Sequence, residues 1–451
     1  MDQRSLPAPR LAPLLESARR ELFALSPSAR ARAQAALKHP NETAEALAAL
    51  RPRYALTLRC ALAAKLAAKG RMAPWPGFLK ASQARAEDFA HAAFWDEQGL
   101  GEAAYPWPDW ATFPPSAWAA VETLTRSAEE LPGPQELYLA LFPKALRHAA
   151  GEYYTPHWLA EHLLDLAAYD GEESLLDPTC GSGVFLTAAL ARHLARQTAA
   201  GLTPEAIVAK LPRNVVGIDN NPLAVLAARA ACLLALPETF LDSALALRPR
   251  LIHEGDVLLA PPELGPFAQV VGNPPWVAYD NLAPGLRERL RPIWEGYGLF
   301  PKIGFEAILG GGKKDLSLLI SYAVSARYLA PLGRLSFLIT RAAFKSAGAA
   351  ASFRRFRLAP EGPGDLEVLG VEDWSNRPLF FGASTQTVLF SWRRDRETRY
   401  PVPYLRREPD APSGSRPQRL AARPAREADP CSPWLSQSPQ NEALLTQLCA
   451  P

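Results

Sequence analysis

The stretch VVGNPPWVAYD, residues 270–280, joins an apolar run to groups that could do chemistry. Proline cannot donate a backbone hydrogen bond and favours extended backbone in the residue before it, so a strand that begins here must end near Gly272. Asn273 then supplies a side-chain amide, and Trp276 supplies a flat aromatic face. By itself, NPP is more often a turn than a site.

Each of four short candidate strands is followed by a polar side chain that could hydrogen-bond to a ligand. The four residues are Asp177, Asp219, Asp256 and Asn273. Because the carboxyl ends of parallel strands share one edge of a sheet, where ligands bind at the topological switch point, these side chains should line one crevice. An Asp before a helix is also often only its cap. The joint pattern favours a site, since capping does not predict NPPW after the fourth candidate strand.

The segment PTCGSGVF follows Asp177 directly and predicts a ligand loop. Gly181 and Gly183 precede the next helical run, and glycine allows both a tight turn and the close approach of a ligand to the backbone. The loop is not G-x-G-x-x-G and has no P-loop lysine. It suits a nucleoside-bearing ligand without a pyrophosphate, with Asp219 placed for ribose hydroxyls and Asp256 for an exocyclic adenine amine.

The elements that must hold these groups alternate between strand and helix from about residue 150. Short β-branched or leucine-rich runs are separated by helical stretches, a pattern typical of βαβ units, so we expect an α/β fold with a Rossmann-like, doubly wound, mostly parallel sheet over residues 146–404. Two later runs, 366–374 and 384–392, should pair as a hairpin at the far edge of that sheet.

The two ends of the chain differ from this middle part. Residues 1–145 are rich in Ala, Leu, Arg and Glu with apolar residues at helical spacing, so we expect a helical N-terminal domain. Residues 405–451 show no periodicity and many Pro, Arg and Ser residues, so we interpret them as a disordered tail.

Bulk composition narrows the class of protein. The 451 residues are 48% hydrophobic and 21% charged with a net charge of +3, an ordinary globular profile in which net charge does not indicate a nucleic-acid partner. None of the five cysteines forms a C-x-x-C pair, so neither a zinc site nor a disulfide framework is indicated. No signal peptide or run of about 18–20 apolar residues is evident. We expect a soluble cytoplasmic protein that uses no metal.

The ordered set of motifs resembles the N6-adenine DNA methyltransferases of restriction–modification systems, of the type I or type IIG kind in which the cofactor loop precedes NPPW. The segments that carry the resemblance are GEYYTP (151–156), LLDPTCGSGVFL (175–186), GIDNNPLAV (217–225), GDVLL (255–259), GNPPW (272–276), KDLSLLISYAVSARYLAPLGRLSFLIT (314–340) and RPLFFGASTQTVLF (377–390). The resemblance covers about residues 130–404 and implies a seven-stranded S-adenosylmethionine-dependent methyltransferase fold.

The resemblance also implies roles for individual residues. The cofactor, S-adenosylmethionine, would be held by Thr155, Asp177, Pro178, Cys180, Gly181, Gly183, Asp219, Asn220 and Asp256, with Ile218 and Asn220 packing on its adenine. The catalytic pocket would consist of Asn273, Pro274, Pro275 and Trp276. The target base would also contact Tyr279 and Phe380 or Phe381.

The expected chemistry follows from the electronic structure of adenine. Its exocyclic amine is a poor nucleophile because the nitrogen lone pair is delocalised into the ring. The Asn273 side-chain oxygen and the Pro274 carbonyl would accept both amine hydrogens and favour the electron-rich nitrogen as it attacks the sulfonium methyl group. The base must flip out of the DNA duplex, and stacking on Trp276 would contribute about 1–3 kcal/mol.

Two groups of basic residues are candidates for contact with DNA phosphates, although a solvated helix face is an equal alternative. They are Arg287, Arg289 and Arg291, and Arg341, Lys345, Arg354, Arg355 and Arg357. The related enzymes continue into a target-recognition domain, which the irregular residues after Tyr404 do not predict. A separate specificity or restriction subunit is therefore a candidate partner.

Two other functions remain open from the sequence. One is an amino-methyltransferase that acts on RNA or protein, and the other is a partner-dependent or inactive modification subunit. The GEYYTP lead-in and the DPTCGSG loop argue against the first, and the intact NPPW tetrad argues against the loss of activity.

Overall fold

The computed structural model describes residues 155–247, 250–300, 314–346, 350–359, 365–376, 379, 385–407 and 417–438. The expected helical domain over residues 1–145 lies outside these residues, as do Phe380 and Phe381. The chain divides into two compact units. The helical unit contains Cys180–Pro212 and Asn221–Glu254, together with Thr155 and Pro156; the sheet unit contains His157–Thr179, Arg213–Asn220 and the described residues from Gly255 onward.

The helical unit consists of α9, most of α10, α11, α12 and the short strand β3. Their bounds are Val184–Ala199, Pro204–Asn214, Pro222–Ala235, Glu238–Leu247 and Ile252–Glu254. The Arg229 guanidinium on α11 donates hydrogen bonds of 3.3 and 2.9 Å to the Ile252 carbonyl and so ties α11 to β3. The Ser243 hydroxyl donates to Glu205 Oε1 at 3.2 Å and links α12 to α10.

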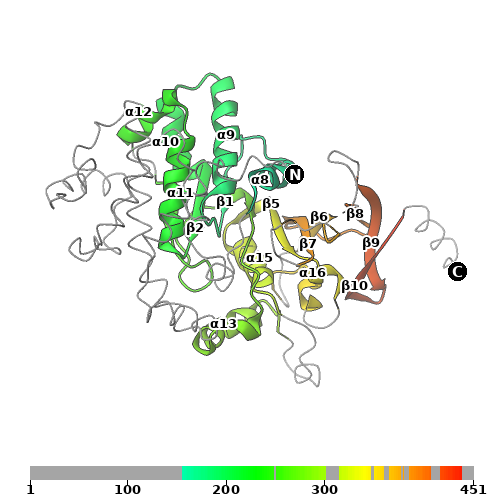
Figure 1. The fold of residues 1–451 in the computed structure, drawn as a ribbon. Coiled ribbons are helices and arrows are strands. Elements are labelled where there is room, and N and C mark those ends of the chain that lie inside the picture. The colour runs from blue at the N-terminus through cyan, green and yellow to red at the C-terminus, as the bar shows by residue number, and fades with distance from the viewer. Residues whose placement is uncertain are drawn as a thin grey trace, which may run out of the picture. The chain divides into compact units, whose positions relative to one another are not determined.

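The sheet unit is built on nine strands, and all of them except β4 carry labels in Figure 1. They are β1 (Leu175–Asp177), β2 (Val215–Asp219), β4 (Phe267–Gly272), β5 (Leu329–Thr340), β6 (Leu366–Asp373), β7 (Thr387–Arg394), β8 (Val402–Arg406), β9 (Gln418–Arg426) and β10 (Asp429–Gln437). They follow one another in the order β10-β9-β8-β6-β7-β5-β4-β1-β2. The expected α/β class is confirmed, but β8, β9 and β10 extend the sheet beyond the seven strands expected.

The strand directions place seven carboxyl ends on one edge of the sheet. β1 is parallel to β2 and β4, and β4 is parallel to β5. β5 and β6 are both antiparallel to β7, and β6 is parallel to β8. β10 runs in the same direction as β8, because both are antiparallel to β9. The strands that end on the same side, which we call the carboxyl edge, are therefore β1, β2, β4, β5, β6, β8 and β10. The expected pairing of 366–374 with 384–392 is confirmed as β6 with β7, although β6 is not an edge strand because β8 pairs with it.

Two helices of the sheet unit, α8 (His157–Leu166) and α15 (Leu316–Arg327), pack on the central strands. α8 contacts β4 and β5, and α15 contacts β5. Every α15 residue from Ser317 to Ser325 is buried, as in a helix that is apolar nearly all round. Its buried serines are satisfied locally, for example by the Ser321 hydroxyl donating to the Ser317 carbonyl at 2.7 Å. The α15 helix is thus a fixed part of the core behind the site.

The interpretation of residues 405–451 as a disordered tail is wrong for residues 417–438, which form the antiparallel pair β9 and β10. Along β9, burial alternates between Leu420, Ala422 and Pro424 and their partly exposed or exposed neighbours, the period of two of a half-buried strand. On β10, the buried Trp434 ring lies 4.8 Å from the ring of Phe344. Alanine and proline have low β-propensity, so this strand pattern is hard to see in the sequence.

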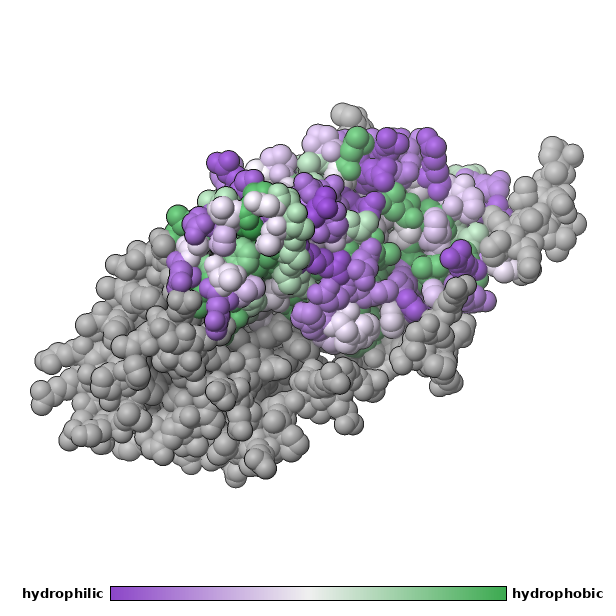
Figure 2. Space-filling view, turned by 90° about the horizontal axis from the view of Figure 1, so that it is seen from above, coloured by the Kyte–Doolittle hydropathy of each residue, from purple (hydrophilic) through white to green (hydrophobic). Residues whose placement is uncertain are grey.

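The surface of the described residues mixes polar and apolar side chains. In the view of Figure 2, purple and green residues are interspersed over the coloured part. The exposed large apolar side chains come from separate segments: Trp158, Leu247, Leu332, Tyr400 and Leu435. Among the described helices, none combines the length and hydropathy that a membrane crossing requires. Within the same residues, no group of three or more His, Cys, Asp or Glu side chains is arranged to hold a metal ion.

Candidate active site

Asp177 lies close to Gly272, the residue before Asn273, where β1 and β4 end. Parallel pairing sets Leu176 beside Val270, so Asp177 and Gly272 come close at the carboxyl edge. A Cβ atom on Gly272 would lie 2.7 Å from Asp177 Oδ1 and 3.6 Å from the Phe337 ring, so only glycine fits. The fully buried Asp177 carboxylate therefore lies against the backbone of the residue that precedes Asn273.

The Asp177 carboxylate is held in an environment that opposes its negative charge. Its Oδ1 accepts a hydrogen bond of 3.1 Å from the Thr179 backbone N–H, whereas Oδ2 has no hydrogen-bond partner among the residues that the structure describes. Burial raises the pKa of Asp177 well above its ordinary value, and the negative charge of Asp219 raises it further, against the Thr179 hydrogen bond. A cationic ligand at this point would stabilise the carboxylate.

Asp219 and Asp256 lie beside each other beyond the end of β2. The Gly255 backbone N–H donates to the Asp219 carbonyl at 3.0 Å, so Asp256 follows directly on this contact. Asp256 Oδ1 accepts from Leu258 N at 2.9 Å and from Leu259 N at 3.1 Å, which makes it the cap of a turn. Asp219 is partly exposed. Asp256 therefore caps a turn, and Asp219 lies at the end of β2.

The loop after Asp177 continues into the helical unit with the backbone that its glycines require. Gly181 and Gly183 have φ angles of +52° and +89°, in the left-handed region that favours glycine. A Cβ on Gly183 would lie 3.1 Å from the Ala228 Cα atom, because the start of α9 packs closely on α11. Beside Gly181 there is open space for 4 Å around the corresponding Cβ position. Pro178, Cys180 and Thr155 are buried.

The NPPW loop is pinned at several points within the sheet unit. Asn273 is partly buried and Pro274 is buried, while Trp276 Nε1 donates to the Leu338 carbonyl of β5 at 3.2 Å. Leu316 N donates to the Val277 carbonyl at 2.9 Å, which ties the loop to the start of α15. The NPPW loop therefore lies at the carboxyl edge next to Asp177, with the Asn273 side-chain oxygen buried.

Comparison with known families and structures agrees with this geometry. Residues 134–293 match the family model described as N-6 DNA Methylase. Over this segment the chain is similar to the N-6 DNA methylases. No curated protein matches the chain.

Three solved structures share the fold at low sequence identity. The type IIG restriction endonuclease BpuSI has a TM-score of 0.53 at 16% identity, over 85% of this chain and 41% of that chain. The type IIL enzyme MmeI in complex with DNA has a TM-score of 0.50 at 13% identity, over 90% and 60%. The type ISP enzyme LlaBIII bound to DNA has a TM-score of 0.50 at 14% identity, over 88% and 30%. The chain thus spans less than two thirds of each of these proteins.

Two expected ligand contacts, Ile218 and Tyr279, have other partners in the structure. Ile218 is fully buried in the hydrophobic core, so the expectation that it packs on a cofactor is wrong. The Tyr279 hydroxyl donates to the Arg287 carbonyl at 3.3 Å, and its ring lies edge-on to Phe300 at 5.1 Å. A contact of Tyr279 with the base stays a prediction. Asn220 is exposed, next to Asp219.

Two residues of the second basic group, Arg354 and Arg355, donate to carbonyls of the protein itself. Arg354 is 1% exposed, and its guanidinium donates to the carbonyls of Cys431 at 2.9 Å and Ala343 at 2.8 Å. Arg355 donates to the Tyr297 carbonyl. Arg354 and Arg355 therefore fit neither alternative: they are not placed to contact DNA phosphates, and they do not lie on a solvated helix face.

The remaining basic candidates differ in exposure and pairing. Arg357 pairs with Asp365 at 3.2 Å, with half of its side chain exposed. Arg289 and Arg291 are exposed on α13 (Pro284–Gly296), where Arg291 pairs with Glu295 at 2.9 Å. Arg287 is partly buried on the same helix. These positions fit a solvated helix face for the first basic group.

Asp315 is a site-supporting residue that sequence reasoning missed. Its Oδ1 accepts from Ser317 N at 2.9 Å and from the Ser317 hydroxyl at 2.7 Å, which caps the N-terminus of α15. An isolated strand bridge joins Asp315 to Ala278, two residues after the NPPW tetrad. Burial raises the pKa of Asp315 to about 6, against these hydrogen bonds. The signal was available, because Asp directly before an apolar run is typical of an N-cap.

Proposed function

We propose that this protein transfers a methyl group from S-adenosylmethionine to the exocyclic N6 of a flipped adenine in DNA. It would act in the cytoplasm as the modification component of a restriction–modification or phage-defence system. The observation that carries the proposal is the contact of the Asp177 carboxylate with Gly272. It brings the end of the cofactor motif against the residue that precedes the NPPW loop. The N-6 DNA Methylase match supports this class of reaction.

The residues of the sheet unit fit the charge of the cofactor. S-Adenosylmethionine carries an ammonium and a sulfonium group, and when bound it supplies the electrophilic methyl group. The buried Asp177 Oδ2 atom and the Thr179 hydroxyl both lack a hydrogen-bond partner among the described residues. Asp219 adds a second carboxylate whose negative charge is felt at Asp177. A cationic amino acid portion would satisfy these groups, since a buried carboxylate is stabilised by an opposite charge.

The remaining cofactor contacts follow the motif resemblance. Thr155 and the loop from Asp177 to Gly183, including Pro178, Cys180 and Gly181, would hold the methionine portion. Asp219 would accept hydrogen bonds from the ribose hydroxyls, with Asn220 beside it. Asp256 would take the adenine amine with the oxygen that does not cap its turn.

The NPPW loop would act through acceptors that are already in place. The Asn273 side-chain oxygen and the Pro274 carbonyl accept the two hydrogens of the adenine amine and hold its nitrogen toward the methyl group. This favours the transition state, in which positive charge develops on that nitrogen. The hydrogen bond from Trp276 to Leu338 holds the indole ring in place, so that the flipped base can stack on it.

Labelled methyl transfer tests the proposal. Purified protein is incubated with methyl-labelled S-adenosylmethionine and, separately, with DNA, RNA and a protein mixture, and we expect label in DNA alone. Asn273→Ala should lower transfer by about 100-fold or more, the typical loss for one pre-placed polar group in a transition-state site, with cofactor affinity nearly unchanged. The exposed Asn281 provides a matched control, because Asn281→Ala removes the same side chain outside the tetrad. Full activity of Asn273→Ala, or label in RNA or protein instead of DNA, would overturn the proposal.

Dependence on a separate specificity or restriction subunit is the alternative form of this function. The chain covers 41% of BpuSI and 60% of MmeI, so large parts of those enzymes have no counterpart in the matched region. A protein that binds the cofactor but methylates DNA only after a partner is added would select this form. A protein that methylates DNA alone would exclude it.

A further inference from the structure

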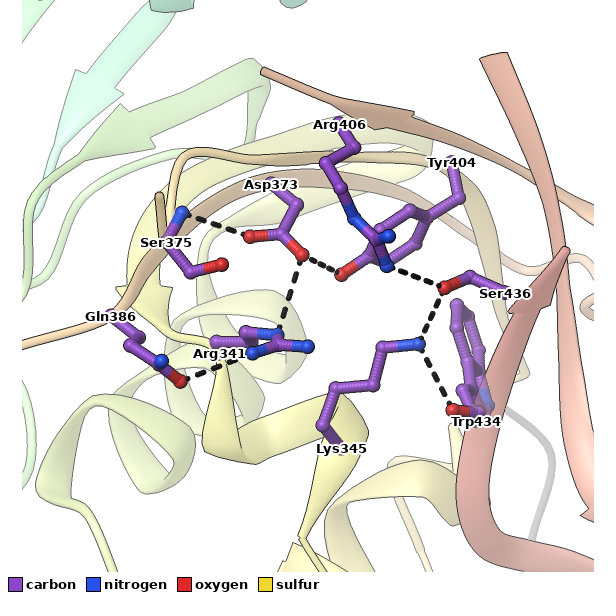
Figure 3. Close-up of polar contacts among 9 residues, drawn as sticks. All are labelled: Arg341, Lys345, Asp373, Ser375, Gln386, Tyr404, Arg406, Trp434 and Ser436. Atoms are coloured by element: carbon purple, nitrogen blue, oxygen red, sulfur yellow. Dashed lines mark hydrogen bonds and ion pairs between the residues drawn. The ribbon is translucent and has the colours of Figure 1, made fainter. Parts of the chain in front are cut away.

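A cluster of cationic side chains lies at the carboxyl edge of the sheet (Figure 3). Arg341 follows β5, Lys345 ends α16 (Ala342–Lys345), and Arg406 ends β8. Asp373, at the end of β6, is the one carboxylate among the residues drawn. We call Arg341, Lys345 and Arg406 the cationic cluster.

The Asp373 carboxylate neutralises one member of the cluster and has little capacity left. Its Oδ2 lies 3.3 Å from Arg341 Nε and accepts a hydrogen bond of 2.5 Å from the Tyr404 hydroxyl. Its Oδ1 accepts from the Ser375 backbone N–H at 2.9 Å. Arg341 also donates to Gln386 at 3.2 Å, a neutral partner. The charge of Asp373 is therefore directed to Arg341.

The other two cations converge on neutral acceptors. Lys345 Nζ lies 2.8 Å and Arg406 Nη2 lies 3.2 Å from the same atom, Ser436 Oγ. Lys345 also donates to the Trp434 carbonyl at 3.0 Å and lies over the Tyr404 ring. Burial lowers the pKa of Lys345 to about 8, with a further contribution from the positive charges of Arg341 and Arg406 against Asp373. Two positive charges thus share one hydroxyl group.

The cluster can be reached by a ligand. Arg341, Lys345, Arg406 and Ser436 are all partly exposed. The serine hydroxyl accepts from both cations, so its own hydrogen is available for a third group. Lys345, Arg406 and the Ser436 hydroxyl thus place three hydrogen-bond donors close together, an arrangement that suits the oxygens of a phosphate group. Arg354 and Arg355, by contrast, donate to carbonyls of the protein itself.

The strand register fixes where the cluster lies relative to the NPPW loop. Ile339 of β5 and Asp373 of β6 both pair with Val388, and Arg406 pairs with Asp373, so these residues lie level across the sheet. Gly272 pairs with Phe337 on the neighbouring strand, one strand spacing of about 4.8 Å away. From β4 to β8 there are four spacings, or about 19 Å. At about 3.4 Å per nucleotide this distance corresponds to about six nucleotides.

We propose that Arg341, Lys345 and Arg406, with the Ser436 hydroxyl, form a binding site for a phosphate group. Resting on the proposed function, the group is a backbone phosphodiester of the DNA strand that carries the target adenine, within about six nucleotides of it. Binding there fixes the register of the strand on the enzyme, since phosphate contacts position DNA without reading its sequence.

The salt dependence of DNA binding measures the binding of this phosphate. The full-length double variant Lys345→Gln/Arg406→Gln should bind duplex DNA about tenfold more weakly than the wild type at low salt, as for the loss of a charge-assisted hydrogen bond. The slope of log affinity against log salt should become shallower by about 0.9 for each DNA phosphate that the variant no longer neutralises. Fluorescence anisotropy over a salt series gives both values, and thermal unfolding confirms that the variant is folded. A folded double variant with the wild-type slope and affinity would overturn the proposal.

Two further variants keep the test independent of general charge and of folding. Arg426→Gln removes one positive charge from β9 at a position 71% exposed and far along the strand from Gln418, the partner of Arg406. Its slope should equal that of the wild type. Lys345→Arg keeps the positive charge and should keep the slope. A slope that falls in Arg426→Gln or in Lys345→Arg as much as in the double variant would contradict a local phosphate site.

Two assays, methyl transfer to DNA and the binding of inorganic phosphate, distinguish a failure of this inference from a failure of the proposed function. Methyl transfer to DNA by the wild type, combined with unchanged slopes in the double variant, would leave the function standing and reject the site. If the wild type neither binds nor methylates DNA, the proposed function fails. Calorimetry with inorganic phosphate then decides: binding that disappears in the double variant identifies a site for free phosphate, and binding that is absent or unchanged rejects the site.

Discussion

Gly272→Ala should damage the site through a single contact. The new methyl group would lie 2.7 Å from Asp177 Oδ1, well inside an ordinary van der Waals distance, and 3.6 Å from the Phe337 ring. Phe337 and Asp177 are both fully buried, so neither can move into solvent. The Asp177 carboxylate must shift by about 0.5 Å or more, away from the Thr179 N–H at 3.1 Å.

The cost of this substitution follows from two contributions. Inserting a methyl group into a well-packed core costs about 1–3 kcal/mol, and weakening the hydrogen bond to Asp177 adds about 1 kcal/mol. We expect the free energy of unfolding to fall by about 2–4 kcal/mol and cofactor affinity to fall about tenfold, because the displaced carboxylate no longer faces the ligand. Denaturant unfolding and calorimetric titration with S-adenosylmethionine measure the two effects.

Gly265→Ala is the matched control, since a Cβ at that position meets nothing within 4 Å. Its unfolding free energy should change by less than about 0.5 kcal/mol, as for an ordinary surface substitution. Wild-type stability and cofactor affinity in Gly272→Ala would refute the contact between the two motifs.

Two further substitutions test separate parts of the structure. Because burial and Asp219 raise the pKa of Asp177, the folded protein retains this proton to higher pH than the unfolded chain and loses stability as pH rises above the ordinary carboxyl range. Without cofactor, Asp177→Asn should therefore gain stability relative to the wild type from about pH 4 to pH 7 in denaturant unfolding, and a constant difference would contradict this. Arg354→Met removes two hydrogen bonds from a buried guanidinium, so we expect a loss of about 2–4 kcal/mol and faster proteolysis within residues 417–438. Proteolysis at the wild-type rate would show that Arg354 does not hold this segment.

The sequence predicted the parts of the fold in which the local pattern of apolar residues matches the burial of those residues in the folded protein. The runs that end at Asp177, Asp219 and Asn273 are buried strands whose ends lie on one edge, and alternation with helices specified their parallel arrangement. Asp256 was the least certain of the four, because the run before it is short and polar. The structure shows its capping hydrogen bonds.

The features that the sequence did not predict depend on contacts between distant residues. The segment QRLAARPAR of β9 alternates small or β-unfavourable residues with arginines, so its periodicity is weak until pairing with β8 supplies the buried face. Arg354 was grouped with surface charges because arginine is rarely buried, and its carbonyl partners lie on other elements. The fit of Gly272 against Asp177 depends on the register of two strands about 95 residues apart, which no local pattern encodes.

The most direct test of the account is the identity of the methylated base. DNA incubated with the protein and S-adenosylmethionine is digested to nucleosides and analysed by mass spectrometry. The proposed function predicts N6-methyladenine in the wild-type reaction and its absence with Asn273→Ala. Methyl groups on cytosine, or N6-methyladenine formed equally well by Asn273→Ala, would contradict the assignment of this loop as the adenine methylation site.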